Sequence, residues 1–363
     1  MTQRTDVLVI GAGQAGLSVG QFLARTELSL RIVDAGPRIG WVWRRRWDSL
    51  RLFTAAKHND LPGMAFPGDR DALPGKDHVA DYLLSYAQRF DLPVECGAPV
   101  ERLTAERGGP ARYRAVTGDR DLWAEQVVVA TGPTGTPRIP DLAGSIDPAV
   151  AQVHAAEYRN PNQLPDGPVL VVGAGNSGAE IAVELARTRE VWLAGREVGT
   201  LPVKLAGLPY RLLNRYVTSD TRWGRSLARG NSGKGTPLVR LTEDDLTRAG
   251  VRRLPRVDTV DKGMPVAGGR LVQPAAIVWS TGYVRDFSWI ELPVLNDSGD
   301  PDHHRGVVRG EPGLYVLGLP FLHSFASSLL MGMERDARHI AETVLRRHRS
   351  AGWRTPLTAG GGP

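Results

Sequence analysis

The sequence predicts an α/β protein with two interlocked Rossmann-like dinucleotide-binding domains, and three observations support this fold class. A glycine pattern near the N-terminus, Gly11-Ala-Gly13-Gln-Ala-Gly16, is repeated far downstream as Gly173-Ala-Gly175-Asn-Ser-Gly178. Each copy lies between an apolar, β-rich run and a helical stretch, which is the order of a dinucleotide-binding unit. A strand-like run that ends in Thr-Gly also occurs twice, once on each side of the second copy.

The first glycine turn follows an apolar run at residues 6–10 and precedes a helical stretch at residues 17–25. Gly11 suits the tight turn, Gly13 lets the backbone approach a pyrophosphate, and Gly16 lets the helix pack closely on the strand. A second strand ends in Asp34, 23 residues after Gly11. A carboxylate there suits the two hydroxyls of a ribose, so the first turn is expected to bind a dinucleotide.

The second glycine turn has the same surroundings, with a strand at residues 168–172 and a helical stretch at residues 179–187. The same offset of 23 residues from Gly173 leads to Arg196 instead of an acidic residue. A guanidinium at this position can stack on adenine and pair with a 2′-phosphate, whereas a carboxylate selects a free ribose hydroxyl. The second turn is therefore expected to bind NADPH.

The two Thr-Gly segments define the domain organisation. The run at residues 125–130 leads into Thr131-Gly132, and the run at residues 275–280 leads into Thr281-Gly282. The chain is expected to leave the first lobe after residue 159, to form the second lobe from 160 to 284, and to return to the first lobe from 285 to 363. A ligand cleft is expected between the lobes, where the carboxyl ends of the strands converge.

Composition excludes several other classes of protein. The single cysteine, Cys96, rules out a disulfide framework, a Cys-x-x-Cys redox centre and a cysteine-based zinc site. No metal is expected, because no histidine or carboxylate set has ligand spacing. The net charge of +6 comes from scattered arginines without a nucleic-acid module, so no nucleic-acid partner is expected. No apolar run reaches the length of a membrane span, which favours a cytoplasmic protein without membrane contact.

Two further stretches have helical periodicity and are expected to pack on the first lobe. Residues 76–92 place Val79, Leu83 and Tyr86 on one face, and residues 334–349 place Ile340 and Val344 on one face.

With both glycine motifs in view, the whole chain resembles the flavin-containing monooxygenases, class B flavoprotein monooxygenases, and in particular their short bacterial branch. Further motifs carry this resemblance: Gly40-Trp-Val-Trp-Arg-Arg-Arg-Trp47-Asp-Ser-Leu-Arg-Leu-Phe-Thr54, Leu61-Pro-Gly63, Val128 to Gly132, and Gly313-Leu-Tyr-Val-Leu-Gly-Leu-Pro-Phe-Leu-His323.

The resemblance implies that the first lobe, residues 1–159 and 285–363, is an FAD-binding domain and that the inserted lobe, residues 160–284, is an NADPH-binding domain. The residues expected at FAD are Gly11, Gly13, Gln14, Ala15, Gly16, Asp34, Gly40, Trp43, Trp47, Ala130, Thr131, Gly132 and Leu330. Those expected at NADPH are Gly173, Gly175, Asn176, Ser177, Gly178, Arg196, Thr281 and Gly282.

The chain departs from the family pattern at two places. Where relatives read Gly-Gly-x-Trp, this chain has Trp41 in place of the second glycine. The family's Phe-x-Gly-x-x-x-His stretch, with an aromatic residue four positions later, is half present: His154 and Tyr158 match, but Pro148 and Val150 replace the phenylalanine and the glycine. This segment is expected to link the lobes, and the loss of half the motif weakens any inference about the substrate.

The implied function is an NADPH-dependent monooxygenase. In such enzymes NADPH reduces FAD, dioxygen forms a flavin hydroperoxide, and one oxygen atom passes to a small molecule with a nucleophilic nitrogen or sulfur. Thr54 is the candidate catalytic residue, as a polar group facing the flavin. Two alternatives stay open: an NADPH-dependent flavin oxidase or reductase, and a catalytically silent FAD/NADPH redox sensor. Residues 204–235 have no pattern that identifies a substrate, and the oligomeric state stays open, with a homodimer as one candidate.

Overall fold

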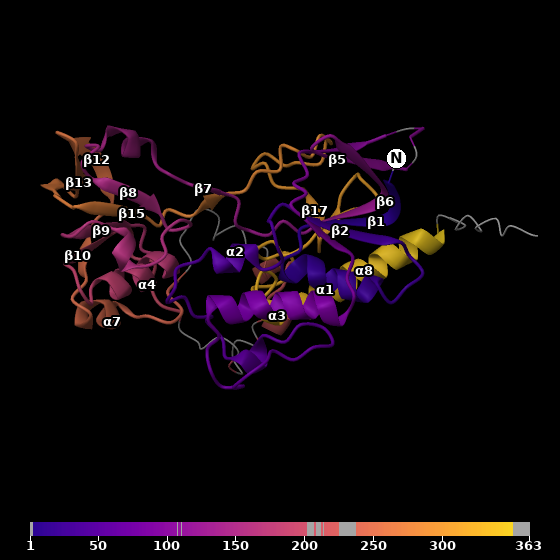
Figure 1. Cartoon of the computed structure of the whole chain (residues 1–363), viewed down its shortest axis with the longest axis horizontal. Coiled ribbons are helices and arrows are strands. Elements are labelled where there is room, and N and C mark those ends of the chain that lie inside the picture. The colour runs from indigo at the N-terminus through magenta and orange to yellow at the C-terminus, as the bar shows by residue number, and fades with distance from the viewer. Residues whose placement is uncertain are drawn as a thin grey trace, which may run out of the picture.

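The structure consists of two lobes that lie side by side, and two segments of chain run from one lobe to the other (Figure 1). It is a computed structural model that describes residues 3–106, 108–109, 111–201, 207, 212, 214–224 and 237–350. Each lobe is built around a sheet with a parallel centre, so the predicted α/β fold class with two Rossmann-like domains is confirmed.

The first lobe contains a nine-stranded sheet whose path runs β17-β18-β19-β6-β1-β2-β3, with β5 paired to β6 and β4 paired to β5. Its central strands β1, β2, β3, β6 and β19 are parallel to one another. The strand bounds are β1 Gln3–Ile10, β2 Leu30–Asp34, β3 Val94–Cys96, β4 Arg102–Ala105, β5 Tyr113–Thr117, β6 Arg120–Val129, β17 His303–His304, β18 Val307–Val308 and β19 Leu314–Val316.

The second lobe contains a five-stranded parallel sheet in the order β11-β10-β9-β15-β8. Its strands are β8 Ala151–His154, β9 Val169–Val172, β10 Val191–Ala194, β11 Arg252–Leu254 and β15 Ala276–Trp279. A small antiparallel sheet of β12 Val257–Asp261, β13 Met264–Ala267 and β14 Arg270–Leu271 belongs to the same lobe. Strand β8 pairs with β15, so the chain joins the second sheet before the predicted boundary at residue 160.

Helices cover the sheets as the sequence periodicity predicts. The α-helices are α1 Gln14–Leu23, α2 Trp41–Arg44, α3 Lys76–Arg89, α4 Asn176–Leu185, α7 Glu243–Arg248 and α8 Met333–Ser350. Short 3₁₀ turns are η1 Ala56–His58, η2 Asp141–Ser145, η3 Pro161–Gln163 and η4 Leu330–Gly332. Helices α1 and α4 begin three residues earlier than the helical stretches expected from sequence, because Gly13 and Gly175 are their N-caps. No helix in the described part of the chain has both the length and the apolar character needed to cross a membrane.

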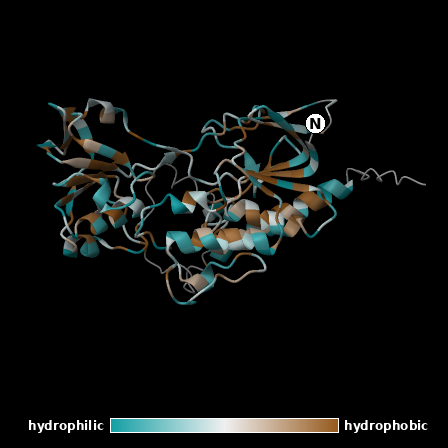
Figure 2. Ribbon diagram, in the orientation of Figure 1, coloured by the Kyte–Doolittle hydropathy of each residue, from teal (hydrophilic) through white to brown (hydrophobic). Residues whose placement is uncertain are grey.

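Strand β1 separates two hydrophobic cores, because successive side chains of a strand point to opposite faces of the sheet. Val7 and Val9 pack with side chains of α1, α3 and α8, whereas Leu8 and Ile10 pack with β5, β6 and β19. All four residues are buried. Figure 2 shows strands inside the first lobe in brown, the hydrophobic end of its scale, as expected for a sheet that is covered on both faces.

The two crossings between the lobes pair with each other. Strand β7, Thr136–Pro137, follows the Thr131-Gly132 segment, and strand β16, Tyr283–Val284, follows Thr281-Gly282. The two strands form an antiparallel pair between the lobes (Figure 1). The paired connections expected from the repeated Thr-Gly pattern are therefore present.

Candidate functional site

The two glycine turns have the same backbone geometry. Gly11 and Gly173 both have φ of +110°. A Cβ at Gly11 would collide with the carbonyl of Ala130, and a Cβ at Gly173 would collide with the carbonyl of Ser280. Both turns therefore need glycine for backbone conformation and for close approach to the neighbouring strand end.

The third glycine of each turn serves helix packing. A Cβ on Gly16 would overlap the carbonyl oxygen of Gly11, and a Cβ on Gly178 would overlap that of Gly173. Each glycine thus lets the first turn of its helix lie directly on the end of the preceding strand, as the sequence predicts.

The middle glycines, Gly13 and Gly175, face open space. A Cβ at either position would have no atom of the described protein within 4 Å. Both residues are helix N-caps without a side-chain cap, so the first backbone N–H groups of α1 and α4 point outward. Free N–H groups and the positive end of a helix dipole suit a phosphate, so both turns fit the pyrophosphate of a dinucleotide.

Asp34 lies at the end of β2, against the first turn. Its Oδ2 accepts a hydrogen bond from the Ala12 N–H at 2.6 Å, and its Oδ1 accepts from the Gly36 N–H at 2.7 Å. An ionised carboxylate has about four lone-pair sites, so Asp34 can still accept hydrogen bonds from ribose hydroxyls.

The second turn differs from the expected arrangement by one residue. Ile10 pairs with Val33 and Val172 pairs with Ala194, so the position after the strand is Asp34 in the first lobe and Gly195 in the second. The placing of Arg196 at the equivalent of Asp34 is wrong, because the connection from α4 to β10 is one residue shorter. Arg196 is the next residue and is exposed.

A cavity of about 250 Å³ lies between the lobes and contains the N-termini of both helices. Gln14 begins α1, and Asn176 and Ser177 begin α4. The other lining residues are Trp43, Arg46, Trp47, Leu50, Arg51, Leu52, Phe53, Thr54, Asn59, Thr134, Glu180, Tyr283, Ser328, Leu329 and Leu330. The cleft expected between the lobes is therefore present, and the two dinucleotide turns open toward it.

A segment of the first lobe forms one wall of this cavity. Gly40 has φ of +77° and its Cα lies so close to Ala80 of α3 that a Cβ would collide with the Ala80 backbone. Helix α2 follows and carries Trp43 into the cavity. Trp47 is 5% exposed and packs with the core of the second lobe. Both predicted tryptophans thus lie at the cavity, and Trp47 also joins the lobes.

Thr54 lies in the cavity wall with its hydroxyl already engaged. It is buried, and its Oγ1 donates a hydrogen bond to Asn59 Oδ1 at 2.7 Å. The Asn59 amide donates to the carbonyls of Thr54 and Ala55 at 3.0 Å. The free lone pairs of the Thr54 oxygen remain, so in this arrangement Thr54 accepts a hydrogen bond from a ligand and does not donate one.

Two buried polar groups of the cavity have no hydrogen-bond partner in the described structure: the Trp47 Nε1–H and the Glu180 Oε1. Burial raises the pKa of Glu180 to about 7, although Arg240 opposes the shift. The Arg240 Nη1 is 3.6 Å from Glu180 Oε1, beyond hydrogen-bond distance, and donates to the Arg51 carbonyl at 3.0 Å. A polar ligand in the cavity can form hydrogen bonds with both this donor and this acceptor.

The linker residues brace the lobes. His154 is buried, its Nδ1 accepts from the Ala156 N–H at 3.1 Å, and its Nε2 is 3.1 Å from the Gly282 carbonyl. Burial lowers the pKa of His154, which favours the neutral ring with the proton on Nε2. The Tyr283 hydroxyl accepts from Arg46 of the first lobe, and the Arg46 guanidinium also lies over the Tyr283 ring at 5.4 Å. His154 therefore supports the linker.

The remaining predicted site residues frame the turns. Ala130, Thr131 and Gly132 follow β6, where Ala130 N donates to the Ile10 carbonyl at 2.8 Å. Thr281 Oγ1 donates to the Arg138 carbonyl in the linker. Ala15 is buried beneath the first turn, and Leu330 begins η4 at the cavity.

The sequence analysis did not identify several residues that line the cavity. Only one of them, Glu180, could have been found from a pattern in the sequence. Glu180 lies four residues after Asn176, one helical turn along α4, so helical spacing places both on one face. Arg46 and Asn59 lie in irregular segments, and Tyr283 lies in the two-residue strand β16, so no periodicity indicates the direction of these side chains. Most of residues 204–235, for which the sequence identified no ligand, lies outside the described residues.

Comparison with known proteins identifies relatives over nearly the whole chain. Residues 8–200, just over half of the chain, match the model of the family described as pyridine nucleotide-disulphide oxidoreductase. An uncharacterized CzcO-like oxidoreductase from Geobacillus kaustophilus is 40% identical over 356 residues, which cover 95% of this chain and 99% of that one. An indole-3-pyruvate monooxygenase from Oryza sativa subsp. japonica is 26% identical and covers 93% of this chain and 90% of its own length.

Solved structures give the same result for the fold. The flavin-containing monooxygenase from Stenotrophomonas maltophilia superposes with a TM-score of 0.80 at 28% identity, covering 96% of this chain and 100% of its own. An oxidised steroid monooxygenase bound to NADP superposes with a TM-score of 0.70 at 16% identity, over 96% of this chain and 86% of its own, and shows likeness of fold alone.

Replacing Glu180 with Gln is expected to change how stability depends on pH. The folded protein keeps the Glu180 proton up to about pH 7, whereas the unfolded chain loses it near 4.5. Stability that depends on this group therefore falls as pH rises from about 4.5 to 7, by on the order of 3 kcal/mol. A neutral amide has no such loss, so the Tm of the variant relative to the wild type should rise across this range and then level off. The exposed Glu197→Gln should follow the wild-type profile, and a parallel profile for Glu180→Gln would contradict the assignment.

Proposed function

The chain belongs to the pyridine nucleotide-disulphide oxidoreductase family, and from this premise we propose that it is an FAD-containing, NADPH-dependent monooxygenase. Its substrates in this proposal are dioxygen and a small organic molecule that takes up one oxygen atom at nitrogen or sulfur. The observation that carries the proposal is a single cavity between the lobes onto which two complete dinucleotide turns open. An enzyme that passes electrons from one dinucleotide to another needs such a shared space.

FAD is assigned to the first turn and NADPH to the second. The first turn has Asp34 at the end of β2, which suits the free ribose hydroxyls of FAD. In the second lobe Gly195 stands at that position, so no carboxylate opposes a 2′-phosphate, and the exposed Arg196 is adjacent. The name of the Stenotrophomonas maltophilia structure, a flavin-containing monooxygenase, supports the flavin assignment.

When bound, reduced flavin supplies the activation of dioxygen, and the protein supplies the surroundings for that chemistry. Trp43, Trp47 and Leu50 line the cavity with apolar surface and exclude water from it. Thr54 offers a lone pair from a fixed position, since Asn59 holds its hydroxyl. The Trp47 Nε1–H and the Glu180 carboxyl offer a donor and an acceptor to a polar group of the bound molecules.

Thiol-disulfide reduction, which the family description also covers, does not fit this sequence. Reduction through a redox-active pair of cysteines is not open to this chain, because the sequence has Cys96 alone. Cys96 lies on strand β3, away from the cavity lining, and burial raises the pKa of its thiol, which reduces the nucleophilic thiolate.

The proposal is tested by following the oxygen atoms. FAD-loaded protein would be given NADPH, isotopically labelled dioxygen and a panel of small amines and thioethers. A monooxygenase gives one labelled oxygen atom in the product and one in water for each NADPH consumed. Hydrogen peroxide in amounts equal to the NADPH consumed, without labelled product across the panel, would favour an oxidase or reductase. Absence of NADPH consumption with every acceptor would favour the silent sensor.

Replacing Gly13 with Val is expected to give a folded protein without flavin. A side chain there meets no described protein atom and instead occupies the space assigned to the FAD pyrophosphate. The matched Gly175→Val should keep its flavin and lose NADPH binding. Flavin absorbance per protein measures the flavin bound by each variant, and circular dichroism shows whether each variant is folded. A yellow Gly13→Val protein would refute the FAD assignment.

Replacing Arg196 with Ala is expected to weaken NADPH selectively. Loss of a charge-assisted contact to the 2′-phosphate should raise the KM for NADPH about tenfold or more and leave that for NADH nearly unchanged. Arg270→Ala, on the small antiparallel sheet of the same lobe, removes an exposed arginine and is the control. Equal changes for both nucleotides would show that Arg196 does not recognise the phosphate.

A further inference from the structure

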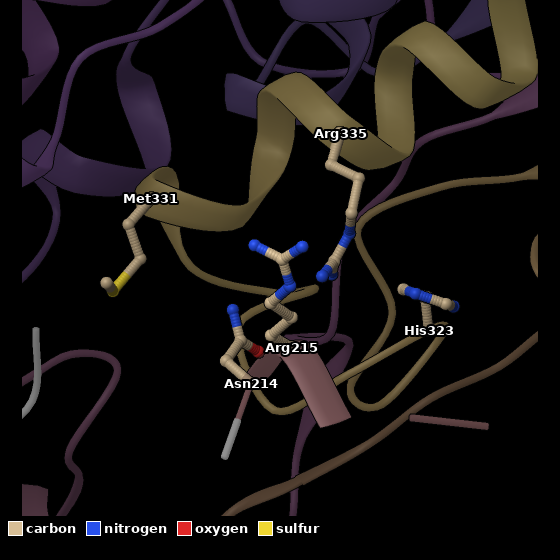
Figure 3. Close-up of a pocket in the computed structure, with 5 residues that line it drawn as sticks. All are labelled: Asn214, Arg215, His323, Met331 and Arg335. Carbon is tan, nitrogen blue, oxygen red and sulfur yellow. The ribbon is translucent and has the colours of Figure 1, made fainter. Parts of the chain in front are cut away.

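A second pocket lies at η4, and its described lining shares no residue with the cavity between the lobes. Its volume is about 420 Å³, and Asn214, Arg215, His323, Met331 and Arg335 line it (Figure 3). Leu330 lines the cavity between the lobes and the next residue, Met331, lines this pocket, so η4 contributes to both. No motif identified from the sequence falls on Asn214, Arg215 or Arg335.

Two guanidinium groups from different parts of the chain meet in this pocket. Figure 3 shows the side chains of Arg215, from the segment at residues 214–224, and Arg335, from the first turns of α8, directed toward the same space. Arg335 is held in place, because its Nη2 donates to Ser324 Oγ at 2.6 Å and its Nε donates to Asp336 Oδ1 at 3.0 Å. Among the residues that the structure describes, no carboxylate forms an ion pair with Arg215.

The third titratable residue of the described lining, His323, adds no charge to the pocket at pH 7. His323 has a side chain that is 11% exposed, and its Nδ1 lies 3.8 Å from Asp220, beyond hydrogen-bond distance. Burial, assisted by Arg335 and Arg305, lowers the pKa of His323 to about 4, so the ring is neutral at pH 7. No Asp or Glu side chain belongs to the described lining of the pocket. Asp336 pairs with Arg335, and Asp220 lies 3.8 Å from His323, so Arg215 is the lining cation for which the described residues show no ion pair.

The pocket is also fixed in position by contacts between its two sides. The Ala326 N–H donates to Asn214 Oδ1 at 3.2 Å, and the Ser219 N–H donates to the His323 carbonyl at 2.7 Å. Both bonds join the segment at residues 214–224 to the loop before η4. The guanidinium groups are therefore presented by anchored backbone, which reduces the entropy lost when a ligand binds.

We propose that this pocket binds the carboxylate or phosphate group of a small anionic molecule, held between the guanidinium groups of Arg215 and Arg335. Planar guanidinium forks form paired hydrogen bonds with both kinds of oxyanion. The positive end of the α8 dipole lies beside Met331 and adds to the attraction. The site is distinct from both dinucleotide turns, and its test does not depend on the proposed monooxygenase activity.

The test is equilibrium binding of simple anions to the full-length, FAD-loaded protein at constant ionic strength and without nicotinamide nucleotide. Inorganic phosphate and acetate are titrated separately against sodium chloride, with Tm and calorimetric heat as readouts. Saturable binding of either oxyanion is expected. Binding of phosphate alone would identify a phosphate-bearing ligand, and binding of acetate alone a carboxylate-bearing one.

Arg215→Ala is the decisive variant, because Arg215 is exposed and makes no described ion pair that folding would lose. Its affinity for the bound oxyanion should fall about tenfold or more, and Arg215→Lys should recover part of it. Arg222→Ala removes another exposed arginine of the same segment, outside the pocket, and should bind as the wild type does. The affinity for NADP⁺ should be equal in all three variants.

Three results would overturn the proposal. The first is absence of saturable binding of both anions to the wild type. The second is equal affinity in Arg215→Ala and Arg222→Ala. The third is a loss of NADP⁺ affinity in Arg215→Ala that matches its loss of anion affinity, which would show that the pocket serves the cofactor's phosphate.

Discussion

The insertion of Trp47 and Leu50 into the core of the second lobe is the contact on which the arrangement of the two lobes depends. Both residues belong to the first lobe, yet they pack with the apolar side chains beneath the second sheet. Burial of a side chain such as Leu50 contributes about 1.5–3 kcal/mol. Backbone pairing supports this contact, since the Asp48 N–H donates to the Arg159 carbonyl at 2.7 Å. Trp43 and Arg46 lie on the same segment, so the contact that joins the lobes also fixes one wall of the cavity.

The two glycine turns share one backbone geometry and differ in the residues around it. The shared φ of +110° at Gly11 and Gly173 and the close packing at Gly16 and Gly178 are requirements of the strand, turn and helix, whatever the ligand. The two turns differ at the residue that follows the paired strand position, where Asp34 accepts two backbone hydrogen bonds and Gly195 has no side chain. Differences between the sites therefore lie outside the glycine motif itself.

The sequence predicts the fold well and the site in part, for physical reasons. Strands β1 and β9 are buried on both faces and therefore have continuous apolar runs. The positive φ and the close packing of each turn require glycine, so both dinucleotide-binding units can be identified from the local sequence pattern. The equivalence of Arg196 with Asp34 fails because a count along the chain does not detect a connection that is one residue shorter. Glu180 lies on a helix and can be placed by periodicity. The lack of a hydrogen-bond partner for its Oε1 is a result of tertiary packing, which the local sequence does not show. Arg215 and Arg335 come together only through contacts between distant segments.

The segment from His323 to Met331 contributes residues to both pockets. The loop before η4 is closed by the Ser327 hydroxyl, which accepts from the backbone N–H groups of His323 and Ser324 at 3.0 Å. Gly332 lies so close to Ala326 that a Cβ would collide with its carbonyl, which holds the loop against η4. These contacts therefore hold η4, in which Leu330 lines one pocket and Met331 lines the other. Because one segment lines both pockets, a ligand that moves it in one pocket would also move residues that line the other.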